Sequence, residues 1–438
     1  MKRIKIEQLN RRVGKKVRIA GWVQTIRDQG AIKFLLIRDD SGVVQVVVKG
    51  SKSKTVFDSI SDLTTESVVE ILGLVKEEKQ APGGLEMAAT SLSVLSKADP
   101  MLPIPIMEKG DGEASQGKRL DWRWLDLRKP KSALIFKIWT TMEQALVNHC
   151  SNNGFTRIHS PKFMSSPSES GGELFEVKYF DRKAYLAQSP QFYKQMAMAS
   201  GMERVFEIGP VFRANPSFTS RHDTEWTSYD MEIAFIDSHQ DVMAEEEKLI
   251  VAMLKAVEKK YGKRVKRILG RKLVVPKRPF PQIEFFEAKK VLKSMGLKSD
   301  KPEDLSPEEE RAISKYVMEQ HGHEFVFVTN WPVSARPFYH MRFEDEPELT
   351  KSFDLLWNGL EVTTGAQREH RYNVLIKQAK EKGLSTKSLK YYLDFFKYGC
   401  PPHGGLGMGA SRMLMKLVGA NNVREVTFLY RGVNRLTP

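Results

Sequence analysis

Short hydrophobic runs recur through the first 97 residues of the chain. They occupy residues 17–27, 33–39, 43–49, 68–77 and 85–95, and Gly, Asp, Ser and Pro separate them. Runs of this length between turn-forming residues predict five β-strands. Five strands in so short a segment favour an OB-fold barrel, which presents one face to single-stranded nucleic acid, with an SH3-like barrel or an open sandwich as the alternative.

The rest of the chain divides into a linker and a large mixed domain. Residues 98–119 are rich in Pro, Gly and charge, which predicts a linker between residues 1–97 and a domain at 120–438. Helical and strand-like periods alternate in this domain, which predicts the α/β or α+β class. We expect helices at 133–152, 241–260 and 306–320, strands at 155–163, 184–188, 204–214 and 227–236, and a glycine-rich strand followed by a helix at 401–419.

The composition adds a positive charge to this picture. Lys and Arg number 69 against 54 Asp and Glu, so the net charge is +15, which favours a polyanionic partner. The two cysteines, Cys150 and Cys400, lack a CxxC or His-rich neighbourhood, which argues against disulfides and structural zinc. Because the chain has neither an apolar export signal nor a membrane-length apolar run, we expect a cytoplasmic location and no membrane contact.

The loop between the strands at 204–214 and 227–236 gathers arginines and an aromatic residue. Arg213 lies at the end of the first strand, Arg221 and His222 lie in the loop, and Trp226 begins the return. Arginine binds polyphosphate through bidentate hydrogen bonds, and an indole can stack on a purine. The loop therefore predicts a nucleotide site, with a charged, solvated hairpin and a core Trp226 as the alternative.

The glycine-rich strand is a second candidate for ligand contact. Gly405, Gly407 and Gly409 alternate at the strand period, so one face lacks side chains and a flat ligand could lie against the backbone. Arg412 follows at the expected start of a helix. Close packing of strands is the alternative explanation for a lone GxGxG.

Two acids form a third candidate. Asp354 and Glu361 would share a face only if the chain turns or bulges at Asn358 and Gly359. Paired carboxylates beside a triphosphate favour Mg²⁺, whereas without the arginines they would be an exposed acidic edge.

These motifs carry a resemblance that covers essentially the whole chain. Residues 154–161 (GFTRIHSP), 211–232 (VFRANPSFTSRHDTEWTSYDME) and 405–412 (GLGMGASR) resemble the three signature motifs of class II aminoacyl-tRNA synthetases. QSPQFYKQ at 188–195 and SPSESGGELF at 166–175 narrow the resemblance to the aspartyl enzymes of the archaeal type. Asn215 and Ser411 depart from it, because glutamate is common at both positions.

The resemblance implies a fold and an assembly. It predicts an N-terminal OB-fold that binds the anticodon and a catalytic domain built on an antiparallel six-stranded sheet flanked by helices. It also implies a homodimer built on the first motif, including Pro161.

The resemblance further implies an activity with ATP as substrate and Mg²⁺ as cofactor. The enzyme would attach L-aspartate to tRNA through an aspartyl-adenylate. ATP would be bound by Arg213 at the α-phosphate, Arg221 and His222 at the outer phosphates, Trp226 and Arg412 on the two faces of adenine, and by Gly409 and Glu361. Mg²⁺ would be held by Glu361, with Asp354 and Thr364 near it.

The same resemblance implies ligands for the amino acid and the anticodon. Lys194 and Arg368 would bind the side-chain carboxylate, and Ser189, Gln191, Asp230 and Glu169 would surround the α-amino group. On the OB-fold, Phe34 would stack on an anticodon base, Gln45 would read the central U, and Arg27 would contact the strand.

Three alternatives remain beside this hypothesis. A lysyl enzyme would need acids where Lys194 and Arg368 place positive charge. An asparaginyl enzyme keeps the arginine but typically lacks this lysine and carries Glu where Asp230 stands. An inactive RNA-binding relative would have lost Arg213, Arg412 or Glu361, and all three are present.

The loop between the last two expected barrel strands bears on which tRNA is charged. Members of the family that accept only tRNA-Asp tend to carry a lysine near the position of Pro82, and a Trp after the GWV turn, where this chain has Gln24. Proline has neither an N–H donor nor a charge, so a candidate hydrogen bond to the third anticodon base is lost. We therefore expect tRNA-Asp and tRNA-Asn as partners, unless Gln24 or a neighbour restores discrimination.

Overall fold

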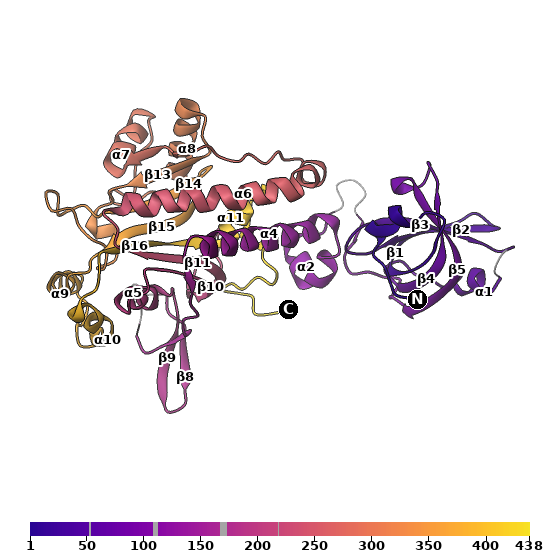
Figure 1. Ribbon diagram of the computed structural model, residues 1–438, viewed down its shortest axis with the longest axis horizontal. Coiled ribbons are helices and arrows are strands. Elements are labelled where there is room, and N and C mark those ends of the chain that lie inside the picture. Colours follow the sequence, from indigo (N-terminus) through magenta and orange to yellow (C-terminus); the bar gives the residue numbers. More distant parts are fainter. Residues whose placement is uncertain (52–53, 108–112, 167–172, 218) are drawn as a thin grey trace. The chain divides into compact units, whose positions relative to one another are not determined.

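The chain folds as two compact units, Met1–Lys129 and Pro130–Pro438, each described here by itself (Figure 1). This computed structural model describes all residues except 52–53, 108–112, 167–172 and 218. Among the helices it describes, none is long and apolar enough to cross a membrane.

The first unit contains a closed five-stranded barrel. Its strands are β1 (Lys16–Asp28), β2 (Ile32–Arg38), β3 (Val43–Lys49), β4 (Val68–Glu77) and β5 (Leu85–Ser96), in the order β1-β2-β3-β5-β4. Alternate residues such as Ile19, Leu35 and Val46 are fully buried in the barrel, because successive side chains of a strand point to opposite faces. The five expected strands and the OB-type barrel are confirmed.

Shorter elements complete the first unit. They are η1 (Ile6–Arg12), α1 (Lys54–Ser59), η2 (Pro82–Gly84), α2 (Gln116–Asp121) and α3 (Arg123–Asp126). Ile104 and Ile106, in the expected linker, are buried in a small apolar cluster with Leu125. The described part of this segment is therefore packed within the first unit, and the domain division at residues 97 and 119 stays a prediction.

A mixed eight-stranded sheet organises the second unit. Its order is β12-β13-β14-β15-β16-β11-β10-β6. The bounds are β6 (Thr156–Arg157), β10 (Arg204–Phe212), β11 (Glu225–Ala234), β12 (Gln282–Glu284), β13 (Phe325–Thr329), β14 (Ser352–Trp357), β15 (Glu361–Arg368) and β16 (His403–Gly409). The six central strands are antiparallel, and β12 and β6 each add a parallel strand at an edge. The expected six-stranded antiparallel sheet is thus confirmed, with one further strand on each side.

One expected strand is divided between two sheets. The segment 155–163 forms only β6 in the large sheet, and β7 (Phe163–Met164) belongs to a separate sheet of order β7-β9-β8 with β8 (Glu176–Tyr179) and β9 (Arg182–Leu186). Pro161 lies between β6 and β7 and is exposed.

Helices cover one face of the large sheet. They are α4 (Pro130–Asn152), α6 (His239–Leu269) and α11 (Ala410–Val418), and α4 and α6 run side by side (Figure 1). The expected helix at 241–260 is longer, because α6 continues to a left-handed glycine cap at Gly270. The other helical elements are α5 (Gln191–Ala199), α7 (Phe285–Ser294), α8 (Pro307–His321), α9 (Tyr372–Glu381), α10 (Lys390–Leu393), η3 (Val333–Ala335), η4 (Asp394–Tyr398) and η5 (Val423–Glu425).

The two faces of β11 have different chemistry. Tyr229, Met231 and Ile233 belong to the core beneath α4 and α6. The residues between them are polar, and Asp230 and Glu232 are buried on the opposite face. The period of two therefore separates the core from a polar face that can carry a site.

A buried acid on α6 gives this core a pH dependence. Glu246 is fully buried, and neither of its carboxyl oxygens has a hydrogen-bond partner among the described residues. Burial raises the pKa of Glu246 from its ordinary 4.5 to about 8. The nearby Thr363 side chain acts in the other direction and lowers the pKa, but burial is the larger cause. The folded chain therefore binds a proton that the unfolded chain releases between these two values, and the free energy of unfolding falls as pH rises through this window.

Glu246→Gln is expected to remove this pH dependence, because the amide has nearly the same shape and does not ionise. The variant should gain roughly 4 kcal/mol relative to the wild-type chain between pH 5 and pH 9. Thermal unfolding of both proteins across this range measures the difference. Parallel pH profiles would show that Glu246 does not titrate with folding.

Candidate active site

A cavity of about 310 Å³ opens on the polar face of the large sheet. Arg213, Arg221, His222, Trp226 and Arg412 all line it, so the loop, the return strand and the last helix meet at one cavity. The guanidinium carbon of Arg213 lies 5.4 Å from the centre of the Trp226 ring. Trp226 is half-buried at the cavity wall, so the core position that the alternative gave to this residue is wrong.

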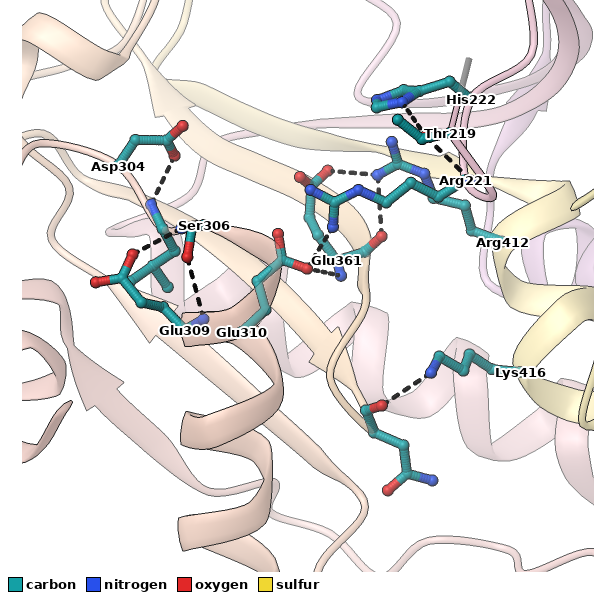
Figure 2. Close-up of polar contacts among 12 residues, drawn as sticks. Thr219, Arg221, His222, Asp304, Ser306, Glu309, Glu310, Glu361, Arg412 and Lys416 are labelled. Carbon is teal, nitrogen blue, oxygen red and sulfur yellow. Dashed lines mark hydrogen bonds and ion pairs between the residues drawn. The ribbon is translucent and has the colours of Figure 1, made fainter. Parts of the chain in front are cut away.

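The loop residues are held by neighbouring side chains. Arg221 Nη1 donates to Glu310 Oε2 at 2.6 Å, and His222 Nδ1 lies 2.6 Å from the Thr219 hydroxyl (Figure 2). Burial, reinforced by Arg412 and Arg221, lowers the pKa of His222 to about 4. At neutral pH His222 therefore offers the cavity a hydrogen-bonding imidazole and no charge.

The two candidate metal acids lie on adjacent strands. Asn358 and Gly359 both have positive φ and turn the chain between β14 and β15. This is the turn that Asp354 and Glu361 need in order to lie on the same face. Asp354 pairs in register with Thr364, whose hydroxyl donates to Glu361 Oε1 at 3.4 Å. The two acids and Thr364 thus lie close together, and Glu361 and Thr364 line the cavity whereas Asp354 does not.

Arginines determine the charge of these acids. Arg336 Nη2 donates to Asp354 Oδ2 at 2.7 Å, and Arg412 Nη1 donates to Glu361 Oε1 at 3.2 Å. Burial raises the pKa of Asp354 to about 6. Burial also opposes ionisation of Glu361, but Arg412 and the other nearby guanidinium groups outweigh it and hold the pKa of Glu361 below its ordinary value.

The donor set can accommodate a magnesium ion. Asp354 Oδ1 is buried and has no hydrogen-bond partner among the residues described, so this oxygen is available to coordinate a cation. Carboxylate and hydroxyl oxygens are the ligands that Mg²⁺ takes, with water and phosphate oxygens at its other positions. Within the described parts of the chain no three His, Cys, Asp or Glu side chains form a dedicated metal cluster.

A buried network of charges lies at another part of the cavity wall. Lys194 Nζ donates to Asp230 Oδ1 at 2.9 Å and lies 3.5 Å from Glu232 Oε2. Arg368 Nε donates to Glu232 Oε1 at 3.0 Å, and its Nη1 donates to His340 Nε2 at 3.1 Å. Burial and Arg368 lower the pKa of His340 well below its ordinary value, so it accepts this hydrogen bond as a neutral ring.

This network changes the charge expected for the pocket. Two buried acids already balance Lys194 and Arg368, whereas the sequence alone indicates only their positive charge. Asp230, expected beside an α-amino group, lines the cavity and accepts from Lys194 with one oxygen and from the Ser228 hydroxyl at 2.6 Å with the other. The pairs leave this part of the cavity close to neutral, with lysine and arginine donors on its wall.

The remaining expected amino-acid contacts lie beside this network. Ser189 and Gln191 line the cavity. The Ser189 hydroxyl accepts from the Gln191 backbone N–H at 3.3 Å, and the Gln191 amide donates to Gln195 at 2.9 Å. Glu169 lies outside the described residues.

The three glycines of β16 have different surroundings. A Cβ at Gly405 would lie 2.1 Å from Glu232 Oε2, and one at Gly407 would lie 3.2 Å from Asp230 Oδ1. Gly405 therefore makes room for a buried carboxylate rather than for a ligand, which corrects the expectation that all three leave ligand space. Gly407 and Gly409 do line the cavity.

The expected anticodon residues share the outer face of the barrel. Arg27 pairs in register with Phe34, and Gln45 pairs with Leu36, two residues further along β2. Side chains directly opposite in an antiparallel pair point to the same face, and this face alternates with the buried one. Pro82 is exposed at the start of η2, between β4 and β5.

Two family models match the chain. The model described as "tRNA synthetases class II (D, K and N)" matches residues 115–431, and "OB-fold nucleic acid binding domain" matches residues 17–95. The chain belongs to the class II aminoacyl-tRNA synthetases of the aspartate, lysine and asparagine group.

Individual relatives of this synthetase are similar along nearly its whole length. The "Aspartate--tRNA(Asp) ligase" of Pyrococcus abyssi is 43% identical over 99% of this chain and 98% of its own. The "Aspartate--tRNA(Asp/Asn) ligase" of Aeropyrum pernix is 44% identical over 97% of this chain and 96% of its own. The crystal structure of Pyrococcus horikoshii asparaginyl-tRNA synthetase with asparaginyl-adenylate has a TM-score of 0.93 at 32% identity, covering 100% of both chains.

Sequence reasoning missed several residues of the synthetase site. They are Glu232, Glu310, Arg336 and His340, which contact the expected residues. Glu232 had a usable signal, because it alternates with Asp230 on a predicted strand. Arg336 and His340 lie in irregular chain outside the named strands, where periodicity gives no signal.

Substitutions at Gly405 and Gly409 should separate the role of β16 in packing against Glu232 from its role in lining the cavity. Gly405→Ala would place a methyl group against the Met231 carbonyl and Glu232, so it should lower the free energy of unfolding by roughly 1–3 kcal/mol and weaken aspartate binding. Gly409→Ala is the control, because its nearest contact would be 3.6 Å and its φ is −76°. Denaturant unfolding and calorimetric titration with aspartate measure both effects. Equal stability of the two variants would contradict the packing argument.

Proposed function

We propose that this synthetase attaches L-aspartate to tRNA-Asp and to tRNA-Asn through an aspartyl-adenylate. The observation that carries the choice of amino acid is the pair of donors Lys194 and Arg368 on the cavity wall. Lysine and arginine side chains only donate hydrogen bonds, so they complement a carboxylate, which only accepts. The similarity to aspartate ligases at 43–44% identity supports the same choice.

ATP occupies the part of the cavity next to the loop between β10 and β11. Arg213 binds the α-phosphate, Arg221 and His222 bind the outer phosphates, and Trp226 and Arg412 enclose the adenine, which approaches the backbone at Gly409. Asp354, Glu361 and Thr364 would hold Mg²⁺, which when bound supplies charge neutralisation to the phosphates.

The residues of the chain orient the two substrates for in-line attack. The α-carboxylate of aspartate attacks the α-phosphorus and pyrophosphate leaves; the terminal ribose hydroxyl of the tRNA then takes the aspartyl group and AMP leaves. Arg213 stabilises negative charge at the α-phosphate, while Lys194 and Arg368 fix the amino acid by its side chain. Positioning and charge stabilisation therefore provide most of the rate.

The amino group and the anticodon have separate ligands in this proposal. The α-amino group is surrounded by Ser189, Gln191, Asp230 and Glu169. Asp230 keeps its bond to Lys194 at the same time. On the barrel, Phe34 stacks on an anticodon base, Gln45 reads the central U and Arg27 contacts the phosphate backbone. The protein acts as a cytoplasmic homodimer in which Pro161, exposed beside the edge strand β6, lies at the interface.

An asparaginyl enzyme is the second candidate, because the asparaginyl-tRNA synthetase of Pyrococcus horikoshii matches this chain with a TM-score of 0.93. Asparagine presents an amide N–H₂ group to Lys194 and Arg368, so donors would face donors. We therefore expect ATP–pyrophosphate exchange with aspartate to exceed exchange with asparagine by about 10³-fold or more in kcat/KM. Measuring exchange with each amino acid in turn decides between them, and comparable rates would favour the second candidate.

The choice of tRNA depends on the third anticodon base, C in tRNA-Asp and U in tRNA-Asn. Pro82 offers no backbone donor to the base, and a lost base contact costs about 1–3 kcal/mol of discrimination. The Aeropyrum pernix relative is named as a ligase for tRNA-Asp and tRNA-Asn, which supports a site that accepts both bases. Aspartylation of both transcripts should therefore differ by less than ~100-fold, and a larger preference would show that Gln24 or a neighbour restores discrimination.

A further inference from the structure

Glu310 on α8 lies next to the cavity but is not among the residues that line it. Glu310 is 4% exposed, and its carboxylate contacts two groups of the ATP region. Arg221 Nη1 donates to Oε2 at 2.6 Å, and the backbone N–H of Glu361 donates to the same oxygen at 3.3 Å (Figure 2). One carboxylate thus joins the loop between β10 and β11 to the start of β15.

The contacts continue from Glu361 to the last helix. Arg412 Nη1 donates to the Glu361 backbone carbonyl at 3.0 Å and to its side chain at 3.2 Å. Arg221, Glu361 and Arg412 all line the cavity. Glu310 is therefore connected, directly or through one residue, to two groups that the proposed function assigns to ATP, Arg221 and Arg412, and to Glu361, which it assigns to Mg²⁺.

Several contacts make α8 a rigid base for this carboxylate. Ser306 and Glu309 form a capping box at the start of α8, and Lys289 Nζ donates to Glu309 Oε1 at 2.8 Å. Gly359 packs so closely on α8 that a Cβ there would lie 2.8 Å from the Arg311 backbone. Lys416 Nζ holds the Asn358 carbonyl at 2.8 Å (Figure 2).

We propose that Glu310 is a positioning residue for ATP, which holds the Arg221 guanidinium and the Glu361 backbone in the geometry that receives the triphosphate. Arginine has five N–H donors, so Arg221 can keep its bond to Glu310 while other donors reach a phosphate. A long side chain fixed in this way loses less conformational freedom when ATP binds. The inference rests on the proposed function, because it concerns the same ATP site.

Glu310→Ala should raise the KM for ATP by ~10-fold or more and leave the KM for aspartate within about twofold. Glu310→Gln keeps an oxygen acceptor of similar reach, so it should recover part of the loss. The readouts are ATP–pyrophosphate exchange at saturating aspartate and the calorimetric Kd for ATP alone, with thermal unfolding of each variant.

Glu247→Gln is the matched control, since this acid on α6 is 4% exposed like Glu310 and also accepts from one arginine, Arg278, and one backbone N–H, that of Phe280, away from the cavity. It should lower thermal stability and leave both kinetic constants within about twofold. Arg221→Ala with and without Glu310→Ala tests the route of the effect. If Glu310 acts through Arg221, the second substitution adds little to the first.

Two results would overturn the inference. One is an unchanged KM and Kd for ATP in a folded Glu310→Ala variant, and the other is that the effects of Arg221→Ala and Glu310→Ala multiply fully in the double variant. If the wild-type chain shows no exchange with aspartate, the proposed function fails by itself. The Kd for ATP then still decides the role of Glu310.

Discussion

Four charged side chains, Lys194, Asp230, Glu232 and Arg368, are buried against one another on the polar face of the large sheet. A buried charge without a partner costs several kcal/mol, so each member requires the others to be in place. They come from α5, β11 and β15, and the glycine at 405 in β16 leaves the space that Glu232 fills. The pocket therefore exists only when these elements are assembled.

The same alternation of charges recurs around the ATP region. Arg221, Arg336 and Arg412 would repel one another if they lined a cavity alone. Glu310 pairs with the first, Asp354 with the second and Glu361 with the third. The acids let the arginines converge at short range, and a polyanion can then bind to guanidinium groups that are already oriented.

Local sequence rules predicted much of the fold. The barrel strands follow from a period of two bounded by turn residues, and α8 begins where Ser306, Pro307 and Glu309 indicate a cap. The rules were less accurate where tertiary contacts decide the outcome. The segment 155–163 is divided between two sheets, and part of the expected linker packs into a small core.

The sequence by itself determined the elements, the candidate arginines and acids, and the motifs that identify the family, because these depend on residue type and short spacing. It also showed that Asp354 and Glu361 could share a face only if the chain turned at Asn358 and Gly359, and the structure has that turn. Only the tertiary structure decided which charge pairs with which. Glu232, Glu310 and His340 meet partners more than 25 residues away in the chain, and such contacts follow from strand order and register, which no local pattern encodes.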